Sequence, residues 1–289
     1  MDYVLYVSTI ICFWAILAIS QNLVLGYAGL FSLCQAAFFG VGAYVSAILF
    51  INFGSSIFIS APAGACVSAL LGAIIAIPSL RLKGDYFFIA TLALQIIVFN
   101  LFVNWESVTK GPLGIYGIYR PHIFGINLNT NLSYLIFSLV FVLLCYFSSN
   151  RICSAPFGLT LKALREDEVA TEAVGKNILK FKVLIFVFSS IWASLAGSLY
   201  IYFVGAVDPF AFTLLESIFI LSIAIVGGMG SLKGSILGAV VLIVIPELLK
   251  FAAMPESIAH QVRNLIYGVC LVLFMMFRPQ GLIGEYRID

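Results

Sequence analysis

The sequence predicts an all-α polytopic membrane protein with about eight to ten transmembrane helices, and three observations support this. Hydrophobic residues make up 62% of the 289 residues, charged residues only 10%, and the mean hydropathy is +1.12. Soluble domains carry about 25% charged residues, so lipid must surround most of this surface. The apolar segments are continuous and not alternating, and backbone groups in lipid must be satisfied internally, so the spans are helices.

Nine apolar segments approach the length of about 20 residues that a spanning helix needs. They are residues 3–20, 34–53, 57–77, 85–104, 132–149, 183–204, 212–226, 233–249 and 264–277. No lysine or arginine precedes Tyr3, so we expect the first segment to be a retained span, since a cleaved signal peptide begins with a basic region. We expect a single transmembrane permease domain over residues 1–289.

The segment between the first two spans, Gln21–Leu33, contains Gly26, Gly29 and the polar Asn22. It is either an ordinary tight connection or a broken, re-entrant half-helix. Glycine-interrupted apolar segments are typical of the discontinuous helices of transporters, but the residues leave both forms open.

The distribution of basic residues predicts the orientation of the chain, because cytoplasmic loops are enriched in lysine and arginine. Eleven of the fifteen lie in the loops 78–84, 150–182, 227–233 and 278–289, and the other four are Lys110, Arg120, Lys250 and Arg263. We therefore expect a cytoplasmic C-terminus. The side of the N-terminus depends on whether residues 21–33 cross the membrane, which stays open.

The polar loop 105–131 is then external. Its glycines and prolines exclude a long helix, and its aromatic residues suit the headgroup region of the membrane. It covers the mouth of a pathway, receives a binding protein, or is a plain interfacial loop.

The cytoplasmic loop 150–182 contains the segment Leu159–Gly175, LTLKALREDEVATEAVG, which we expect to be one helix ended by Gly175. It combines an apolar stripe, small residues and many charges. A soluble partner that docks on it would explain this composition. The alternative is a solvated helix that lies on the membrane, but such helices favour basic over acidic residues.

Gly230, Gly234 and Gly238 recur every four residues. On one helix this spacing predicts a flat stripe against which another helix backbone packs closely. The run Gly227–Gly234 also predicts a tight turn, which can act as a hinge. It is not a phosphate-binding loop, because Lys233 is followed by glycine and not by serine or threonine.

Polar side chains inside spans are the best pointers to a solute route. In the fourth predicted span, Thr91 and Gln95 lie one turn apart on one face, and Asn100 and Asn104 lie on roughly the opposite face. We expect the route to pass beside Thr91 and Gln95, with Glu216 as a further candidate. Each is alternatively an interhelical hydrogen-bonding group. So few intramembrane acids do not favour a proton or sodium relay.

The sequence predicts no metal, no cofactor, no nucleic-acid partner and no enzymatic activity for this chain. Six cysteines are scattered without metal-type spacing and suit small apolar packing roles. The two histidines, His122 and His260, are far apart in the sequence and form no pattern with a nucleophile.

Several stretches resemble a known family of permeases. The longest are NLVLGYAGLFSLCQAAFFGVGAY at 22–44 and APFGLTLKALREDEVATEAVG at 155–175, and the others lie at 80–93, 109–115, 186–200, 225–239 and 277–284. Together they resemble the permeases of bacterial branched-chain amino acid ABC importers. The stretch LRLKGDYFFIATLA at 80–93 favours the LivM type over the LivH type.

The resemblance implies an importer in the bacterial inner membrane. Its pore is formed with a second, LivH-like permease, two ATPase subunits bind below and hydrolyse ATP, and a periplasmic or lipid-anchored binding protein delivers the substrate. The segment 159–175 then matches the loop that contacts the ATPase. The residues on the matching positions are Arg165, Glu166, Glu168, Glu172 and Gly175.

Other functions are compatible with parts of the sequence. The resembled family also includes urea, amide and other amino-acid permeases. An ion-coupled secondary transporter would need an intramembrane acid pair, and a membrane scaffold would not need the polar residues in the fourth predicted span.

Overall fold

The computed structural model describes residues 2–79, 85–123, 126–128, 130–250, 268–269 and 281–283. Long helices dominate this part of the chain, which confirms the all-α prediction. They are α1 (Asp2–Asn22), prolonged by the π-helix η1 (Leu23–Tyr27), then α2 (Gln35–Phe53), α3 (Ile57–Ser79), α4 (Asp85–Asn104), α6 (Asn131–Ser154), α9 (Ile178–Val204), α10 (Leu214–Gly227) and α11 (Leu232–Lys250).

Short elements connect the long helices. They are α5 (Glu106–Thr109), η2 (Gly111–Leu113), β1 (Ile115–Tyr116), β2 (His122–Ile123), β3 (Ile126–Asn127), α7 (Pro156–Glu166), α8 (Glu168–Ala173), β4 (Ala206–Val207) and η3 (Pro209–Phe212). β1 pairs antiparallel with β4, with Ile115 opposite Val207, and β2 pairs with β3.

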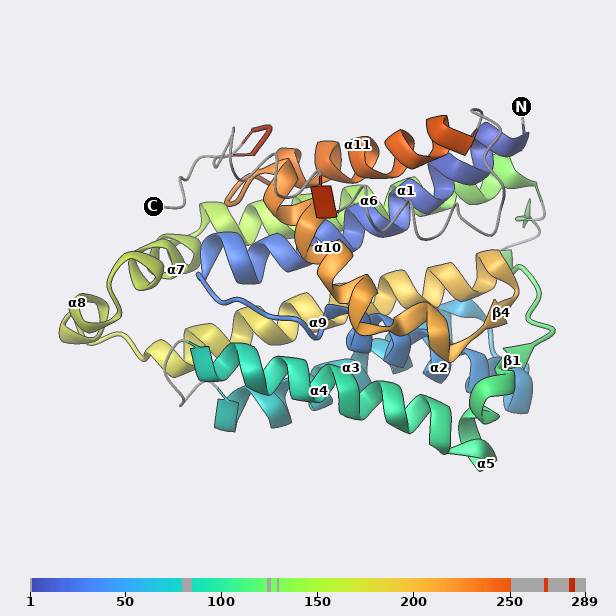
Figure 1. Cartoon of the computed structure of the whole chain (residues 1–289), viewed down its shortest axis with the longest axis horizontal. Coiled ribbons are helices and arrows are strands. Elements are labelled where there is room, and N and C mark those ends of the chain that lie inside the picture. Colours follow the sequence, from blue (N-terminus) through green and yellow to red (C-terminus); the bar gives the residue numbers. More distant parts are fainter. Residues whose placement is uncertain are drawn as a thin grey trace.

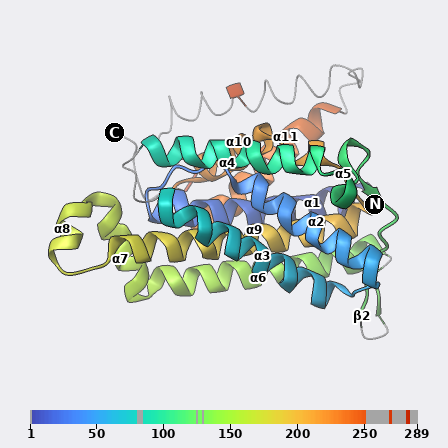
Figure 2. The same ribbon diagram turned by 90° about the horizontal axis from the view of Figure 1, so that it is seen from below.

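Most of the long helices run along one direction (Figure 1), and the view turned by 90° shows the same alignment (Figure 2). Helices α7 and α8 project at one end, called here the α7–α8 end. The N-terminus, α5, β1 and β4 gather at the opposite end, called the β1–β4 end. The beginning of α1 therefore lies at the same end of the bundle as the described residues of the loop 105–131.

Six helices in the described residues are long and apolar enough to cross a membrane, and α10 with α11 forms a seventh crossing if the two count as one broken span. The sequence predicted two separate spans there. Instead α10 has 14 residues, too few to cross alone. The chain bends by 119° between α10 and α11. The glycines between them, Gly228 and Gly230, have positive φ angles that permit so sharp a turn. The predicted span 264–277 lies outside the described residues except for positions 268–269.

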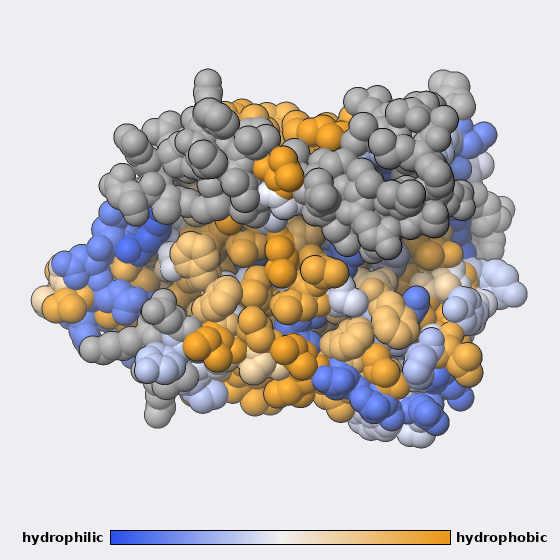
Figure 3. Space-filling model, in the orientation of Figure 1, coloured by the Kyte–Doolittle hydropathy of each residue, from blue (hydrophilic) through white to orange (hydrophobic). Residues whose placement is uncertain are grey.

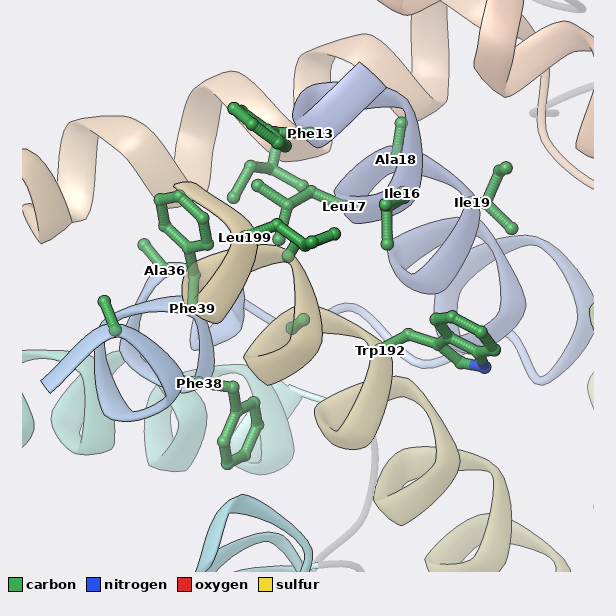
Figure 4. Close-up of a cluster of buried hydrophobic side chains, with 14 of the residues drawn as sticks. Phe13, Ile16, Leu17, Ala18, Ile19, Ala36, Phe38, Phe39, Trp192 and Leu199 are labelled. Atoms are coloured by element: carbon green, nitrogen blue, oxygen red, sulfur yellow. The ribbon is translucent and has the colours of Figure 1, made fainter. Parts of the chain in front are cut away.

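The core lies where α1, α2 and α9 meet. Phe13, Ile16 and Leu17 of α1 are buried beside Phe39 of α2 and Leu199 of α9 (Figure 4). Helix α9 also packs against α3, and α1 against α6.

Hydrogen bonds between spans supplement this packing, as is usual where lipid provides no hydrophobic drive for helix association. The Tyr134 hydroxyl of α6 donates to the Leu199 carbonyl of α9 at 2.6 Å. The hydroxyls of Ser46 in α2 and Ser198 in α9 bond at 2.8 Å. α9 is thus tied to both neighbours.

Candidate functional site

The chain breaks its helical course between α1 and α2. After the π-helix, residues 28–34 form no helix and run from the α7–α8 end back into the bundle, as the thin blue tube in Figure 1 shows. Apart from Gly29 and Phe31, this extended segment is buried. The chain is therefore broken here, as one of the two predicted forms requires, but the segment is extended and continues into α2, so it is not a half-helix that turns back.

Side chains from two other helices satisfy the beginning of α2. The first N–H groups of a helix have no partner within the helix. Here the Ala37 N–H donates to Oε1 of Gln95 in α4 at 2.7 Å, and the Ala36 N–H donates to Oγ of Ser217 in α10 at 3.0 Å. The broken end of α2 is stable inside the bundle because α4 and α10 supply these acceptors.

Gln95 also reaches a second break in the chain. Its Nε2 donates to the carbonyl of Phe212 at 2.8 Å, where η3 ends just before α10 begins. One amide group therefore joins the beginning of α2 to the beginning of α10. Thr91, one turn earlier on α4, accepts a hydrogen bond from the Leu33 N–H at 3.2 Å.

The structure thus places the three predicted route residues around these breaks. Thr91 and Gln95 are 0% and 1% exposed, so neither faces a cavity in this conformation. Glu216 is half-buried in the first turn of α10, one position before Ser217. Asn100 and Asn104 are exposed, as expected for the opposite face of α4.

The other side of the extended segment is held by α1 and α9. Nε2 of Gln21 donates to the Ser32 carbonyl at 2.9 Å. Nε2 of Gln35 donates to the hydroxyls of Ser20 and Ser189. Buried amides and hydroxyls of α1, α4, α9 and α10 therefore supply hydrogen-bond partners around the break.

Asn22 holds the turn between α10 and α11. Its Nδ2 lies 3.1 Å from the Gly228 carbonyl, 2.9 Å from the Ser231 carbonyl and 2.6 Å from the Ser235 hydroxyl, and its Oδ1 accepts from the Gly230 N–H at 3.0 Å. Asn22, at the end of the first span, and Gly230, in the predicted glycine turn, are 208 positions apart in the sequence. Their hydrogen bond brings the two into one local structure.

Only two of the three glycines in the predicted stripe, Gly234 and Gly238, lie on a helix. Gly234 and Gly238 lie on α11, and a β-carbon on either would overlap the backbone of α10, at Gly227 for the former and within 2.5 Å of the Ile223 carbonyl for the latter. Gly230 is not on this helix, contrary to the prediction, because α11 begins at Leu232.

The segment 159–175 is not one helix, which corrects the prediction. α7 ends at Glu166 and α8 begins at Glu168. Asp167 between them has an extended backbone, and its carboxylate accepts hydrogen bonds from the N–H groups of Val169 and Ala170. Aspartate is a preferred N-cap residue, so it starts a new helix here. Gly175 follows α8 with φ +82°, the left-handed conformation expected of a C′ glycine.

Arg165 points into the helix bundle and contacts the break. Its Nη1 donates to the main-chain carbonyl of Gly26 in the π-helix at 2.5 Å. Lys162, on the same side of α7, lies 5.5 Å from the centre of the Tyr27 ring. A β-carbon on Gly26 would overlap both Asn22 and Gly230. α7 thus touches the π-helix, and the π-helix touches the α10–α11 turn.

The remaining predicted coupling residues differ in their surroundings. Glu166 and Glu172 are exposed. Glu168 pairs with the ammonium of Lys182 on α9, a side chain only 8% exposed. Lys182 and Ser217 were not singled out from the sequence, although a lysine at the edge of an apolar span and a serine inside one are both visible there.

Exposed apolar side chains accompany these acids at the α7–α8 end. Leu159 is 66% exposed, and Val169 and Val174 are each 78% exposed. Such residues next to Glu166 and Glu172 form a surface suited to a protein partner. In the described residues, no group of three or more potential metal ligands comes together.

Comparisons with known proteins agree on one family. Residues 3–275 match the model of the family described as "Branched-chain amino acid transport system / permease component". The chain is 34% identical to the high-affinity branched-chain amino acid transport system permease protein LivM of Salmonella typhimurium, over 97% of this chain and 70% of that protein.

Two further relatives are more distant. A probable branched-chain amino acid transport permease protein LivM of Methanocaldococcus jannaschii is 27% identical over 76% of this chain and 66% of that protein. The permease protein LivH of Salmonella typhimurium is 24% identical over 46% of this chain and 41% of that protein. No solved structure matches the chain significantly.

Proposed function

Because the chain belongs to the family of permease components of branched-chain amino acid transport systems, we propose that it is the LivM-type permease subunit of an ATP-driven importer of branched-chain amino acids. The match over 97% of the chain to a LivM permease carries this proposal. Six described spans and a buried polar break in the bundle support it.

The proposed importer contains other subunits. The similarity to LivH supports a second, related permease as partner in the membrane. Two ATPase subunits would hydrolyse ATP, and a periplasmic or lipid-anchored binding protein would deliver the amino acid. The permease itself would carry out no chemical reaction.

The α7–α8 end is the proposed cytoplasmic side and the docking place of an ATPase. Of the basic residues, Arg151, Lys162, Arg165, Lys176, Lys180 and Lys182 all lie here, as the positive-inside rule requires. The exposed Leu159, Val169 and Val174 supply apolar contact area, and Glu166 and Glu172 supply charge. On this orientation the β1–β4 end is external. A cytoplasmic C-terminus stays a proposal from the distribution of basic residues.

Movement of the ATPase would reach the solute route through Arg165. A shift of α7 pulls on the Gly26 carbonyl, and Gly26 is in contact with the turn between α10 and α11. Downstream of Gly26 lies the extended segment that leads into α2. α7 would therefore act on the extended segment directly through the π-helix, and on the α10–α11 turn indirectly through Gly26.

The proposed route passes beside Thr91, Gln95 and Glu216 in a conformation that differs from this one. Thr91 and Gln95 are buried and hydrogen-bonded here. They would become accessible when the beginning of α2 separates from α4. Polar groups would then be present to replace water around the charged ends of the amino acid.

The decisive experiment reconstitutes the permease with its partners in vesicles and measures uptake of leucine with ATP. We expect uptake that disappears without the ATPase. Glu172→Lys together with Val169→Asp should reduce co-purification of the ATPase, because both side chains are exposed on α8 and neither supports the fold. Glu106→Lys, an exposed acid at the opposite end, is the matched control and should leave co-purification unchanged. Uptake driven without any ATPase would refute the proposal.

A further inference from the structure

The outer face of α4 carries amides where lipid would be expected. Asn100 and Asn104 are both exposed. With Ile97, Leu101 and Trp105 they line a surface hollow of about 440 Å³. Hydrophilic surface gathers at the lower right of Figure 3, over the last turns of α4 and over α5.

Helix α6 provides a measure of what a lipid-facing span looks like in this protein. α4 and α6 have the same buried share, 28%. Yet between residues 132 and 147 of α6 every exposed side chain is apolar: Leu132, Ile136, Leu139, Val140, Leu143, Leu144 and Phe147. Equal exposure with different chemistry indicates that the two faces have different surroundings.

The amides of α4 are only partly satisfied. Nδ2 of Asn100 donates to the Ile96 carbonyl at 2.9 Å, and Nδ2 of Asn104 donates to the Asn100 carbonyl at 2.9 Å. An asparagine amide has two N–H donors and a carbonyl acceptor. Within the described residues, the side-chain carbonyl oxygens of both asparagines accept no hydrogen bond. A polar group in a span that is not satisfied by its own chain is usually covered by another helix.

We propose that this face of α4 is the surface that packs against the second permease of the importer, and that Asn100 and Asn104 hydrogen-bond across that interface. The inference rests on the proposed function, which supplies a second permease. The hollow leaves room for side chains of the facing helix between Ile97, Leu101 and Trp105. The partner must therefore present hydrogen-bonding groups, such as hydroxyls, amides or an exposed helix backbone, opposite the two asparagines.

Disulfide or bismaleimide cross-linking to the second permease tests the interface. The six native cysteines are first replaced. Single cysteines are then placed at Asn100, four residues before the end of α4, and at Ile136, five residues after the start of α6, so that the two lie at similar depths from the β1–β4 end. We expect cross-links to single cysteines of the second permease from position 100 and none from position 136.

Polar substitution separates the hydrogen bonds from simple packing. Asn100→Leu with Asn104→Leu should reduce the second permease co-purified about five- to tenfold, the effect of two interhelical hydrogen bonds. Asn100→Ser with Asn104→Ser should restore most of it, and Leu139→Ala on α6 should have no effect.

Several results would overturn the interface. These are cross-links from neither position in an intact complex, cross-links from both equally, or reaction of position 100 with a charged, membrane-impermeant thiol reagent without cross-linking, which would show a face that borders water. Leucine uptake by the cysteine-free complex is measured in parallel. Its absence counts against the proposed function, whereas the cross-link pattern alone decides the interface.

Discussion

The guanidinium of Arg165 donates a hydrogen bond to the carbonyl of Gly26, 139 positions earlier in the chain. Gly26 lies in the last turn of the π-helix, where carbonyls have no partner further along the helix. The Leu30 N–H, which would pair with the Gly26 carbonyl in a continued α-helix, donates instead to the Val24 carbonyl. An arginine from outside the bundle can therefore bind the backbone at the start of the break.

Removing this contact should weaken coupling more than folding. Arg165→Gln loses a charge-assisted hydrogen bond, worth about 1.5–3 kcal/mol. We expect the variant to insert normally while leucine uptake per ATP hydrolysed falls severalfold. Glu106→Gln, an exposed acid at the opposite end of the bundle, is the control and should keep the ratio. An unchanged ratio in Arg165→Gln would remove Arg165 from the coupling route.

Asn22→Leu should destabilise the turn between α10 and α11. The substitution keeps the branched shape of the side chain but leaves the N–H of Gly230 without its acceptor, at about 1–3 kcal/mol for an unsatisfied buried group. The carbonyls of Gly228 and Ser231 lose the Asn22 amide but keep the N–H groups of Ser231 and Ser235 as donors. Hydrogen exchange at residues 227–235 should become faster. Asn22→Asp keeps an acceptor for Gly230 but buries a carboxylate oxygen against the carbonyls of Gly228 and Ser231, so we expect an effect at least as large. Equal exchange in all three proteins would contradict this role.

Gly234→Leu should separate α10 from α11. A β-carbon at this position overlaps the Gly227 carbonyl, and overpacking of this kind costs about 1–3 kcal/mol. We expect a lower melting temperature and loss of complex assembly. Gly268→Ala adds a β-carbon where no atom of the described residues lies within 4 Å and should be neutral. Normal assembly of Gly234→Leu would show that the two helices can part without consequence.

The Glu168–Lys182 pair should be structural. Glu168→Lys leaves the buried Lys182 ammonium opposite a second positive charge, which is strongly destabilising for a desolvated ion. Lower thermal stability is expected for Glu168→Lys, with recovery in the charge-swapped Glu168→Lys/Lys182→Glu protein. Absence of recovery would mean that the pair contributes little. A charge reversal at Glu168 consequently tests the fold, and Glu172 is the better position to test docking.

Cysteines at Thr91 and Gln95 should be unreactive at rest. Both positions are almost completely buried, so a small aqueous thiol reagent should modify them only during turnover with ATP and substrate. The measurement is the labelling rate in a cysteine-free background, with and without ATP. If positions 91 and 95 never react while Leu94 or Val98 does, α4 borders the route with another face.

The sequence predicted the spans well where local pattern decides them. α2 and α4 match their predicted ranges within one residue, and the two polar faces of α4 are as expected, with Gln95 inside and Asn100 outside. Continuous apolar runs of span length leave little choice in a membrane, so local composition was sufficient there.

The misses have two physical causes. Asp167 was counted as one charge among several on a single helix, but its capping of Val169 and Ala170 ends one helix and begins another. The partners of Asn22 and Gln95 lie in distant parts of the chain. No periodicity reports which helices meet in space, so the site that these amides build could only be seen in the fold.

The extended segment 28–34 lowers the free energy that a conformational change of the bundle requires. Several of the hydrogen bonds that hold it and the start of α2 end on side chains, those of Thr91, Gln95, Ser217 and Gln21. A side chain can exchange one backbone hydrogen-bond partner for another by rotating about its single bonds. A continuous helix in lipid must instead break its own backbone hydrogen bonds in order to bend sharply. The extended segment can therefore move by exchanging hydrogen-bond donors and acceptors in the buried polar interior, and no helix has to unfold.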